Sequence, residues 1–472
     1  MTETVAVPLW LLLLLLLLSA WMLTSRLLMP SMRWLMRRRV NKVIDRLNLR
    51  LHISIRPFQL TKREALIDRL AYDTKVLEAI GEYAVEHHLP RELVQQRVLK
   101  YAREIVPAFN AYVYYRVGYA VARRFARMLY SVRVKFHDDN KLAGLDSNAT
   151  VVFVMNHRSN MDYVLVGFLA AKKTALSYAV GEWARIWPLQ QLIRSMGAYF
   201  VRRNSKDPLY RRVLERYVGM ATEQGVCQAV FPEGGLSRDG RLQVPKLGIL
   251  DYMLRGFGPR AERDIVFVPV GINYDRVLED RTLLRALDPT AARRSGWFAL
   301  RTTLKFVAQS LWLGLRSRWQ RFGYASVVFG KPLSVRAYCQ ERDLILAKMD
   351  KESRMVAVAE LSQQLMASID EVVPALPVPL VCKILLEADN TWLSALTIKA
   401  QCQHLLAKAA HAHLPVVIPP SAQEAQFDAA LHMLAIRHLA ETHDGFYRAA
   451  ANEAAILRYY ANSLPRALQS EI

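Results

Sequence analysis

Strand-like apolar runs alternate with helical patterns between residues 150 and 329, and this alternation restricts the fold more than any other feature of the chain. The runs are rich in Val, Ile, Phe and Tyr, and they lie at 150–155, 176–180, 198–201, 226–231, 265–272 and 324–329. Helical patterns lie between them, for example at 208–222 and 245–255. Strands that alternate with helices form a mostly parallel sheet with both faces covered. We therefore predict an α/β domain over residues 133–335.

The regions on either side of this domain are predicted to be helical. Residues 30–132 form a helical region, in which Thr61 opens a Thr-x-x-Glu sequence typical of a capping box and 101–132 is a long periodic pattern. Residues 373–379 read Val-Pro-Ala-Leu-Pro-Val-Pro and predict a hinge. The Ala-rich remainder of the region 336–472 is expected to form a small helical domain.

An uncharged apolar run occupies residues 5–23 and includes eight consecutive leucines. At 1.5 Å per residue, roughly 19 residues reach about 28 Å, close to the thickness of a hydrocarbon core. Seven basic residues follow between positions 26 and 46, whereas no Lys or Arg precedes the run. A secretory signal peptide is the alternative, but it would begin with basic residues. We expect a single-pass anchor at 5–28, with the rest of the chain on the cytoplasmic face of a bacterial inner membrane.

The charge balance predicts an anionic partner. Lys and Arg number 64 against 42 Asp and Glu, a net charge of +22. Next to an anchor, this surface is expected to meet anionic lipid headgroups, although a solvated basic face would look the same. The pattern at 297–322 fits either a basic amphipathic helix on the membrane or a core helix with snorkelling arginines. Zinc-finger spacing and ribonucleoprotein aromatic motifs are absent, so we expect no nucleic acid as partner.

His157 and Asp162 are the first candidates for chemistry. They lie in Asn-His-Arg-Ser-Asn-Met-Asp (156–162), after a strand-like run and before a helical pattern at 163–171. A carboxylate in the first helical turn can bond one ring nitrogen of the histidine and leave the other as a base. Such a pair removes the proton from an attacking hydroxyl. A hydrogen-bonded structural histidine has the same spacing. Metal ligation stays open, although no second His cluster accompanies the pair.

Three further segments end strand-like runs with polar or Gly-rich sequence. Arg202 and Arg203 follow Gly-Ala-Tyr-Phe-Val, and arginine forks match phosphate oxygens; a solvated strand end is the alternative. Residues 231–238, Phe-Pro-Glu-Gly-Gly-Leu-Ser-Arg, carry glycines that let backbone N–H groups approach a ligand or merely form a turn. The last segment, Val-Pro-Val-Gly-Ile-Asn-Tyr-Asp (268–275), has a proline that indicates an edge, a bulge or a strand end.

Missing motifs exclude several other chemistries. The chain has no G-x-S-x-G, H-E-x-x-H or G-x-G-x-x-G sequence. Residues 235–241 resemble a P-loop but lack its Lys-Ser/Thr ending, which argues against nucleotide binding there. The four cysteines are far apart and form no C-x-x-C, so neither a zinc site nor a disulfide framework is predicted.

In this order, the four segments resemble the four motifs of the glycerolipid acyltransferase superfamily: H-x4-D, G-x-x-F-[IV]-R-R, F-x-E-G-G-x-S-R and a V-P-V strand. The blocks 157–163, 202–203 and 233–235 are similar to the sn-glycerol-3-phosphate acyltransferases, and the similarity extends to 71–130 and 456–463. The resemblance implies a mixed sheet flanked by helices, with an N-terminal transmembrane helix, a helical N-terminal region and a small helical C-terminal domain.

The resemblance also implies a role for each matching residue. His157 would be the general base and Asp162 its partner, while Arg203 with Arg202 would hold the phosphate of the acceptor. Pro269 would shape the acyl side of the pocket. The residues implied in positioning glycerol 3-phosphate are Glu233, Gly234, Gly235, Ser237 and Arg238.

The implied reaction moves a fatty acyl group from acyl-CoA or acyl-[acyl-carrier-protein] to the sn-1 hydroxyl of glycerol 3-phosphate, giving lysophosphatidate. No metal or bound cofactor is expected, because the thioester is already activated. Two positions differ from the pattern: Leu236 replaces a usual second arginine, and Pro232 is more similar to the lysophosphatidate branch. A lysophospholipid acyltransferase is therefore an alternative, as is a catalytically silent lipid-binding scaffold of the same fold.

Overall fold

The central feature is an eight-stranded mixed sheet with the strand order β1-β7-β6-β2-β5-β3-β4, in which β8 also pairs with β6. The computed structural model describes Ser19 and residues 56–136, 146, 148–170, 174–181, 189–202, 205–287 and 322–469. The strands are β1 (Ser131–Phe136), β2 (Thr150–Met155), β3 (Ser177–Val180), β4 (Ala198–Phe200), β5 (Gln228–Val230), β6 (Ile265–Tyr274), β7 (Tyr324–Phe329) and β8 (Leu333–Ser334).

The pairing confirms the mostly parallel sheet that the sequence predicts. Strands β6, β2, β5, β3 and β4 run parallel to one another, and β1 runs parallel to β7. Only β7 and β8 pair antiparallel, both with β6. Every residue of β2, β6 and β7 is buried, as expected of strands that are covered on both faces. Strand β1 was not predicted, although its Ser-Val-Arg-Val-Lys-Phe sequence alternates polar and apolar residues with the period of a strand.

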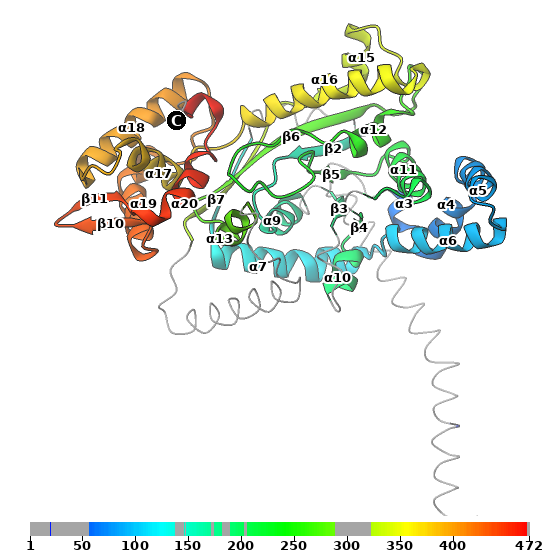
Figure 1. Cartoon of the computed structure of the whole chain (residues 1–472), viewed down its shortest axis with the longest axis horizontal. Coiled ribbons are helices and arrows are strands. Elements are labelled where there is room, and N and C mark those ends of the chain that lie inside the picture. Colours follow the sequence, from blue (N-terminus) through cyan, green and yellow to red (C-terminus); the bar gives the residue numbers. More distant parts are fainter. Residues whose placement is uncertain are drawn as a thin grey trace, which may run out of the picture. The chain divides into compact units, whose positions relative to one another are not determined.

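Helices cover the two faces of the sheet. Helix α16 (Lys351–Asp370) packs on β6 and β2, and Figure 1 shows α7 (Tyr119–Leu129) and α9 (Met161–Ala170) on the other side. One hydrophobic core joins α16 with Val152 and Phe267 of the sheet. The other helices of the sheet region are α10 (Leu189–Ser195), α11 (Pro208–Glu223), α12 (Gly248–Leu254), α13 (Asp280–Arg285) and α15 (Val335–Glu341).

The N-terminal region is helical, as predicted, but its boundaries differ. Thr61 begins no capping box: its hydroxyl donates to the Pro57 carbonyl and it ends a short helix, and the next helix starts without a side-chain cap. The pattern 101–132 is broken after Ile105, close to Pro107, because proline cannot continue the helix. The helices are α3 (Pro57–Leu60), α4 (Arg63–Ala71), α5 (Thr74–Glu86), α6 (Arg91–Ile105), the π-helix η2 (Val113–Gly118) and α7.

The C-terminal region combines helices with a small antiparallel sheet that the sequence analysis missed. The predicted hinge at 373–379 is wrong: this segment is buried, Asn273 donates to the Pro374 carbonyl, and the Val378 N–H donates to Asp275. Proline at the first helical position begins α17 instead. The elements are α17 (Pro377–Glu387), α18 (Ala395–His411), α19 (Gln423–Ile436), α20 (Ala454–Ala461) and the strands β9 (Leu393–Ser394), β10 (Ala440–His443) and β11 (Phe446–Ala449).

The predicted anchor at 5–28 and the segment 297–322 lie outside the described residues. Within the part of the chain that the structure describes, no helix has both the length and the apolar character needed to cross a membrane.

Candidate active site

The carboxyl ends of neighbouring strands bring the candidate residues to one edge of the sheet. His157 follows β2, Phe231 follows β5, and Tyr274 ends β6. These strands are parallel neighbours in the order β6-β2-β5, so their carboxyl ends meet. Ligands of open α/β sheets bind at this edge.

His157 and Asp162 form a direct hydrogen bond. The Nδ1 of His157 lies 2.9 Å from the Oδ2 of Asp162, and both side chains are almost completely buried. Asp162 sits in the first turn of α9, as the sequence predicts. With Nδ1–H donating to the carboxylate, the other nitrogen, Nε2, carries the lone pair that can accept a proton.

The Asp162 carboxylate is itself held in place by neighbours. Its Oδ2 accepts the backbone N–H groups of Arg158 at 2.8 Å and Ser159 at 3.1 Å, while Oδ1 accepts the hydroxyl of Tyr274 at 2.6 Å. Burial, and then the neighbouring Asp162, raise the pKa of Tyr274, so this hydroxyl remains a donor. Sequence reasoning missed Tyr274, although it belongs to the fourth segment and ends the strand beside β2.

Aromatic rings fix the plane of the imidazole. The ring of His157 stacks on Phe231, with centroids 4.0 Å apart and planes 26° apart, and Tyr163 meets it edge-on at 5.3 Å. Because Asp162 fixes one ring nitrogen and these contacts fix the plane, the base is preorganised.

Glu233 positions the loop that carries the base. Its Oε1 accepts the His157 backbone N–H at 2.9 Å, and its Oε2 accepts the backbone N–H of Gln243 at 3.1 Å. Burial raises the pKa of Glu233 to about 7, against an opposing influence of Arg158. Both carboxyl oxygens are thus engaged by the protein, so the contacts of Glu233 are those of a loop-positioning residue.

A pocket of about 200 Å³ opens beside His157. Its wall is mainly apolar, and its cationic members are Arg202 and Lys246. Among the residues that the structure describes, no Asp or Glu lines it. The lining residues are His157, Tyr163, Ala179, Val180, Gly181, Val201, Arg202, Val230, Phe231, Pro232, Gly234, Lys246, Gly248, Ile249 and Leu250.

Arg202 lies at this pocket, but its guanidinium already holds a carboxylate. Nε and Nη2 donate to the two oxygens of Glu104 at 2.8 and 2.6 Å, and the group lies 5.0 Å from the ring centres of both Tyr101 and Tyr210. The hydrogen bond to Glu104 raises the pKa of Arg202. Two of its five N–H donors are used in this way, and the donors that remain are the two on Nη1 and the second one on Nη2. Arg203 lies outside the described residues.

The other predicted binding residues are divided between the pocket and its supports. Gly234 lines the pocket, whereas Gly235 does not. Ser237 is buried; its N–H donates to the His157 carbonyl and its hydroxyl to the Arg241 carbonyl, so it supports the loop. Arg238 points to the carbonyl of Ala286 at 3.3 Å.

Pro269 lies inside β6 and is not among the described residues that line the pocket beside His157. Strand β7 pairs with residues 270–274 of β6, and β8 with residues 266–267. The proline therefore stands where the antiparallel ladder is interrupted, which is where its missing N–H costs least. The predicted edge or strand end at this proline is wrong, because residue 269 lies inside the central strand β6 and its pairing with β2 continues through it.

Comparisons with known proteins find acyltransferase family models along the chain. A family model described as "Acyltransferase" matches residues 133–273, and one described as "Glycerol-3-phosphate acyltransferase C-terminal region" matches residues 310–467. Together they cover more than half of the chain. The chain belongs to the glycerol-3-phosphate acyltransferase family. A family member from Ectopseudomonas mendocina is 32% identical over 286 residues, and one from Pseudomonas entomophila is 30% identical over 286 residues.

These two matches cover 60% of this chain and 33% of each relative, so the chain spans about a third of the length of the family members it matches. Among solved structures, the 1-acyl-sn-glycerophosphate acyltransferase of Thermotoga maritima is similar at 15% identity with a TM-score of 0.30, over 64% of this chain and 96% of that one.

The C-terminal region of this family member reaches the loops of the active site. Asn462 donates to the carbonyl of Asp239 at 2.9 Å, and a Cβ on Gly240 would collide with the carbonyl oxygen of Tyr459. The buried Arg158, next to the base, donates to the Gly240 carbonyl. The His157 loop, the Gly240 turn and α20 are thus linked by consecutive contacts that sequence spacing alone could not reveal.

Proposed function

We propose that this protein transfers a fatty acyl group from acyl-CoA or acyl-[acyl-carrier-protein] to the sn-1 hydroxyl of glycerol 3-phosphate, which gives lysophosphatidate. The observation that carries the proposal is the bond between His157 and Asp162 at the mouth of a pocket. Membership of the glycerol-3-phosphate acyltransferase family supports this choice of acceptor.

The geometry suits acyl transfer by general base catalysis. Nε2 of His157 takes the proton of the acceptor hydroxyl while the oxygen attacks the thioester carbonyl. The carbon–oxygen bond of the ester forms, the carbon–sulfur bond breaks, and the leaving thiolate takes up the proton from His157. Asp162 stabilises the imidazolium between these steps, and Tyr274 keeps Asp162 in place.

The two substrates have different needs, and the pocket provides for both. Apolar side chains such as Val180, Val230 and Ile249 suit the methylene groups of an acyl chain. Arg202 and Lys246 give the same pocket a positive side, which favours a phosphorylated acceptor.

An acceptor panel tests the proposal directly. Detergent-solubilised full chain is given labelled palmitoyl-CoA or palmitoyl-[acyl-carrier-protein] with glycerol 3-phosphate, glycerol or lysophosphatidate, and the products are separated and their acyl position determined. We expect 1-acyl lysophosphatidate from glycerol 3-phosphate. Formation of phosphatidate from lysophosphatidate, with no product from glycerol 3-phosphate, would assign the lysophospholipid reaction instead. Absence of thiol release with every acceptor would support a silent scaffold.

We also propose that residues 5–28 hold the protein on the cytoplasmic face of a membrane, where anionic lipid meets its basic surface. The support is the length of the uncharged run and the basic residues that follow it. Fractionation of cells after an alkaline carbonate wash tests the anchor: the full chain should stay with the membrane, and release into the wash would contradict it.

A further inference from the structure

Of the two cationic side chains that line the pocket, Lys246 is the one whose charged group is not paired with a carboxylate in the described part of the chain. In the described part of the chain, no carboxylate or other acceptor bonds the Lys246 ammonium, and its side chain is exposed. By contrast, Arg202 spends two of its nitrogens on Glu104. A ligand with negative charge that enters beside His157 therefore meets Lys246 as the free partner.

The main chain holds Lys246 at the pocket from a fixed base. Its backbone N–H donates to the carbonyl of Pro232 at 2.7 Å, which ties residue 246 to the loop after β5. The side chain then passes over Gly234, where a Cβ would lie 2.6 Å from Cδ and 3.3 Å from Nζ. Gly234 has a φ of +67°, so its own backbone also disfavours a side chain. The glycine thus leaves open the path by which the lysine reaches the pocket.

The chemistry of the site fits a compact anion. No acidic side chain lines the pocket among the described residues, and the carboxylate of Glu233 is turned to the backbone of His157 and Gln243. An ammonium is a point charge with three donors, which suits the oxygens of a phosphate group. The apolar residues of the lining suit the acyl chain and not the phosphate.

We propose that Lys246 binds the phosphate of the acceptor and so sets which hydroxyl reaches Nε2 of His157. This rests on the proposed function, since it assigns a residue to the phosphate of the same acceptor. Lys246 is then a specificity-determining residue for phosphorylated polyols.

Steady-state kinetics of the full chain in detergent tests the assignment with Lys246→Ala, Lys246→Arg and Arg241→Ala. Arg241 is a matched control, because it is an exposed cation on the same loop and does not line the pocket. We expect Lys246→Ala to raise the KM for glycerol 3-phosphate by roughly tenfold to a hundredfold, as for a lost hydrogen bond between charged groups. Its kcat and its KM for palmitoyl-CoA should stay within about twofold, and Lys246→Arg should restore most of the affinity.

Two further readouts separate phosphate binding from a merely structural role. The preference for glycerol 3-phosphate over glycerol should fall in Lys246→Ala by the same factor, because only the phosphorylated acceptor loses a contact. Inhibition by inorganic phosphate should weaken in parallel. A Lys246→Ala enzyme with an unchanged KM for glycerol 3-phosphate overturns the assignment while the proposed function stands. A wild-type chain that releases thiol with other acceptors but never acylates glycerol 3-phosphate overturns both.

Discussion

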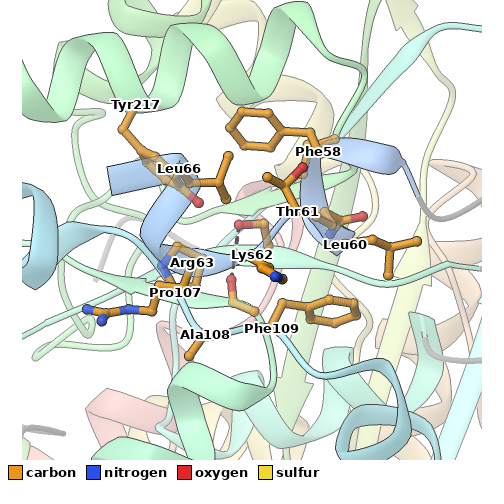
Figure 2. Close-up of a pocket in the computed structure, with 14 residues that line it drawn as sticks. Phe58, Leu60, Thr61, Lys62, Arg63, Leu66, Pro107, Ala108, Phe109 and Tyr217 are labelled. Carbon is orange, nitrogen blue, oxygen red and sulfur yellow. Dashed lines mark hydrogen bonds between the residues drawn. The ribbon is translucent and has the colours of Figure 1, made fainter. Parts of the chain in front are cut away.

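Two pockets of nearly equal size lie at opposite ends of the same strands, and they differ in what their walls can do. The pocket beside His157, of about 200 Å³, lies at the carboxyl ends of β3, β4 and β5. The other, of about 210 Å³ and drawn in Figure 2, lies at their amino ends, where Ser177, Gly197 and Val226 line it together with α3 and α4. Size therefore does not distinguish a candidate active site from a packing gap in this molecule.

Polar groups distinguish the two pockets. At the amino end, Gln59 of α3 donates to the Ala175 carbonyl and so joins the N-terminal helices to the segment before β3. Ser177 donates to the Gly197 carbonyl within the sheet region, and Arg63 donates to the Val106 carbonyl within the N-terminal region. At the carboxyl end, the contacts of Asp162 and Glu233 are directed at a histidine that keeps one nitrogen open. The comparison teaches that the amino-end pocket has the contacts of a structural seam, whereas the carboxyl-end pocket has those of the proposed reactive site.

Removal of the base should have the largest effect. His157→Ala is expected to lower kcat by about a thousandfold, the usual contribution of a general base, with little change in melting temperature. Thiol release from palmitoyl-CoA in the presence of glycerol 3-phosphate measures it, and circular dichroism checks the fold. If the His157→Ala variant turned over at close to the wild-type rate, the carboxyl-end pocket would have no more claim to the reaction than the amino-end pocket.

The second prediction tests the seam. Leu66 is 5% exposed, belongs to the hydrophobic core and lines the amino-end pocket. Leu66→Ala is expected to lower the free energy of unfolding by roughly 2–5 kcal/mol, because it enlarges a cavity in the core. The kcat and both KM values of the folded fraction should stay unchanged. A Leu66→Ala enzyme that loses kcat without losing stability would show that the amino-end pocket takes part in the reaction.

The sequence predicted the reactive edge better than its surroundings, and the reason is the range of the interactions. Strands β2 and β7 have the predicted boundaries, and the hydrogen bond between His157 and Asp162 was predicted because only four residues separate them. The partners that came from distant elements were not predictable. Glu104 meets Arg202 across 98 positions, and Tyr274 meets Asp162 across 112.

Residues whose predicted contacts were wrong also have partners that local sequence does not show. Glu233 and Ser237 were expected to face a substrate, but their contacts are with the His157 loop, which local sequence cannot show. Lys246 was missed because it lies beyond the recognisable Gly-Gly segment in the sequence. The hydrogen bond from its backbone N–H to the Pro232 carbonyl brings it back beside that segment. Thr61 was misread because a Thr-x-x-Glu spacing says nothing of the short helix that ends there.

The third prediction concerns pH, because carboxyl groups with raised pKa lie after the strands of the reactive edge. Burial raises the pKa of Glu233 to about 7 and that of Asp275, which follows β6, also to about 7. Both values exceed those of the unfolded chain, so the native fold binds protons more tightly than the unfolded one. The stability that they contribute is present in full below about pH 4 and is lost as the pH rises through 7.

We therefore expect the urea midpoint of the wild type to fall between pH 5 and pH 8. The same titration with Leu66→Ala is the control from the seam: its midpoint should be lower at every pH, while the pH dependence stays the same. A wild-type midpoint that rises steadily over this range would contradict the raised pKa values of the two carboxyl groups.

The smallest expected effect concerns the hydrogen bond from Tyr274 to Asp162. Tyr274→Phe removes only the hydroxyl that donates to Oδ1 of Asp162 at 2.6 Å, and the ring remains to fill its place. A lost hydrogen bond is worth about 1 kcal/mol, which corresponds to about a fivefold lower kcat if it is felt in the transition state. Because the acceptor does not contact Tyr274 in the proposed mechanism, the KM for glycerol 3-phosphate should not change. A matched Tyr217→Phe at the seam should leave kcat at the wild-type value. If both variants lowered kcat equally, the effect would come from sheet packing, and Tyr274 would not position Asp162 for catalysis.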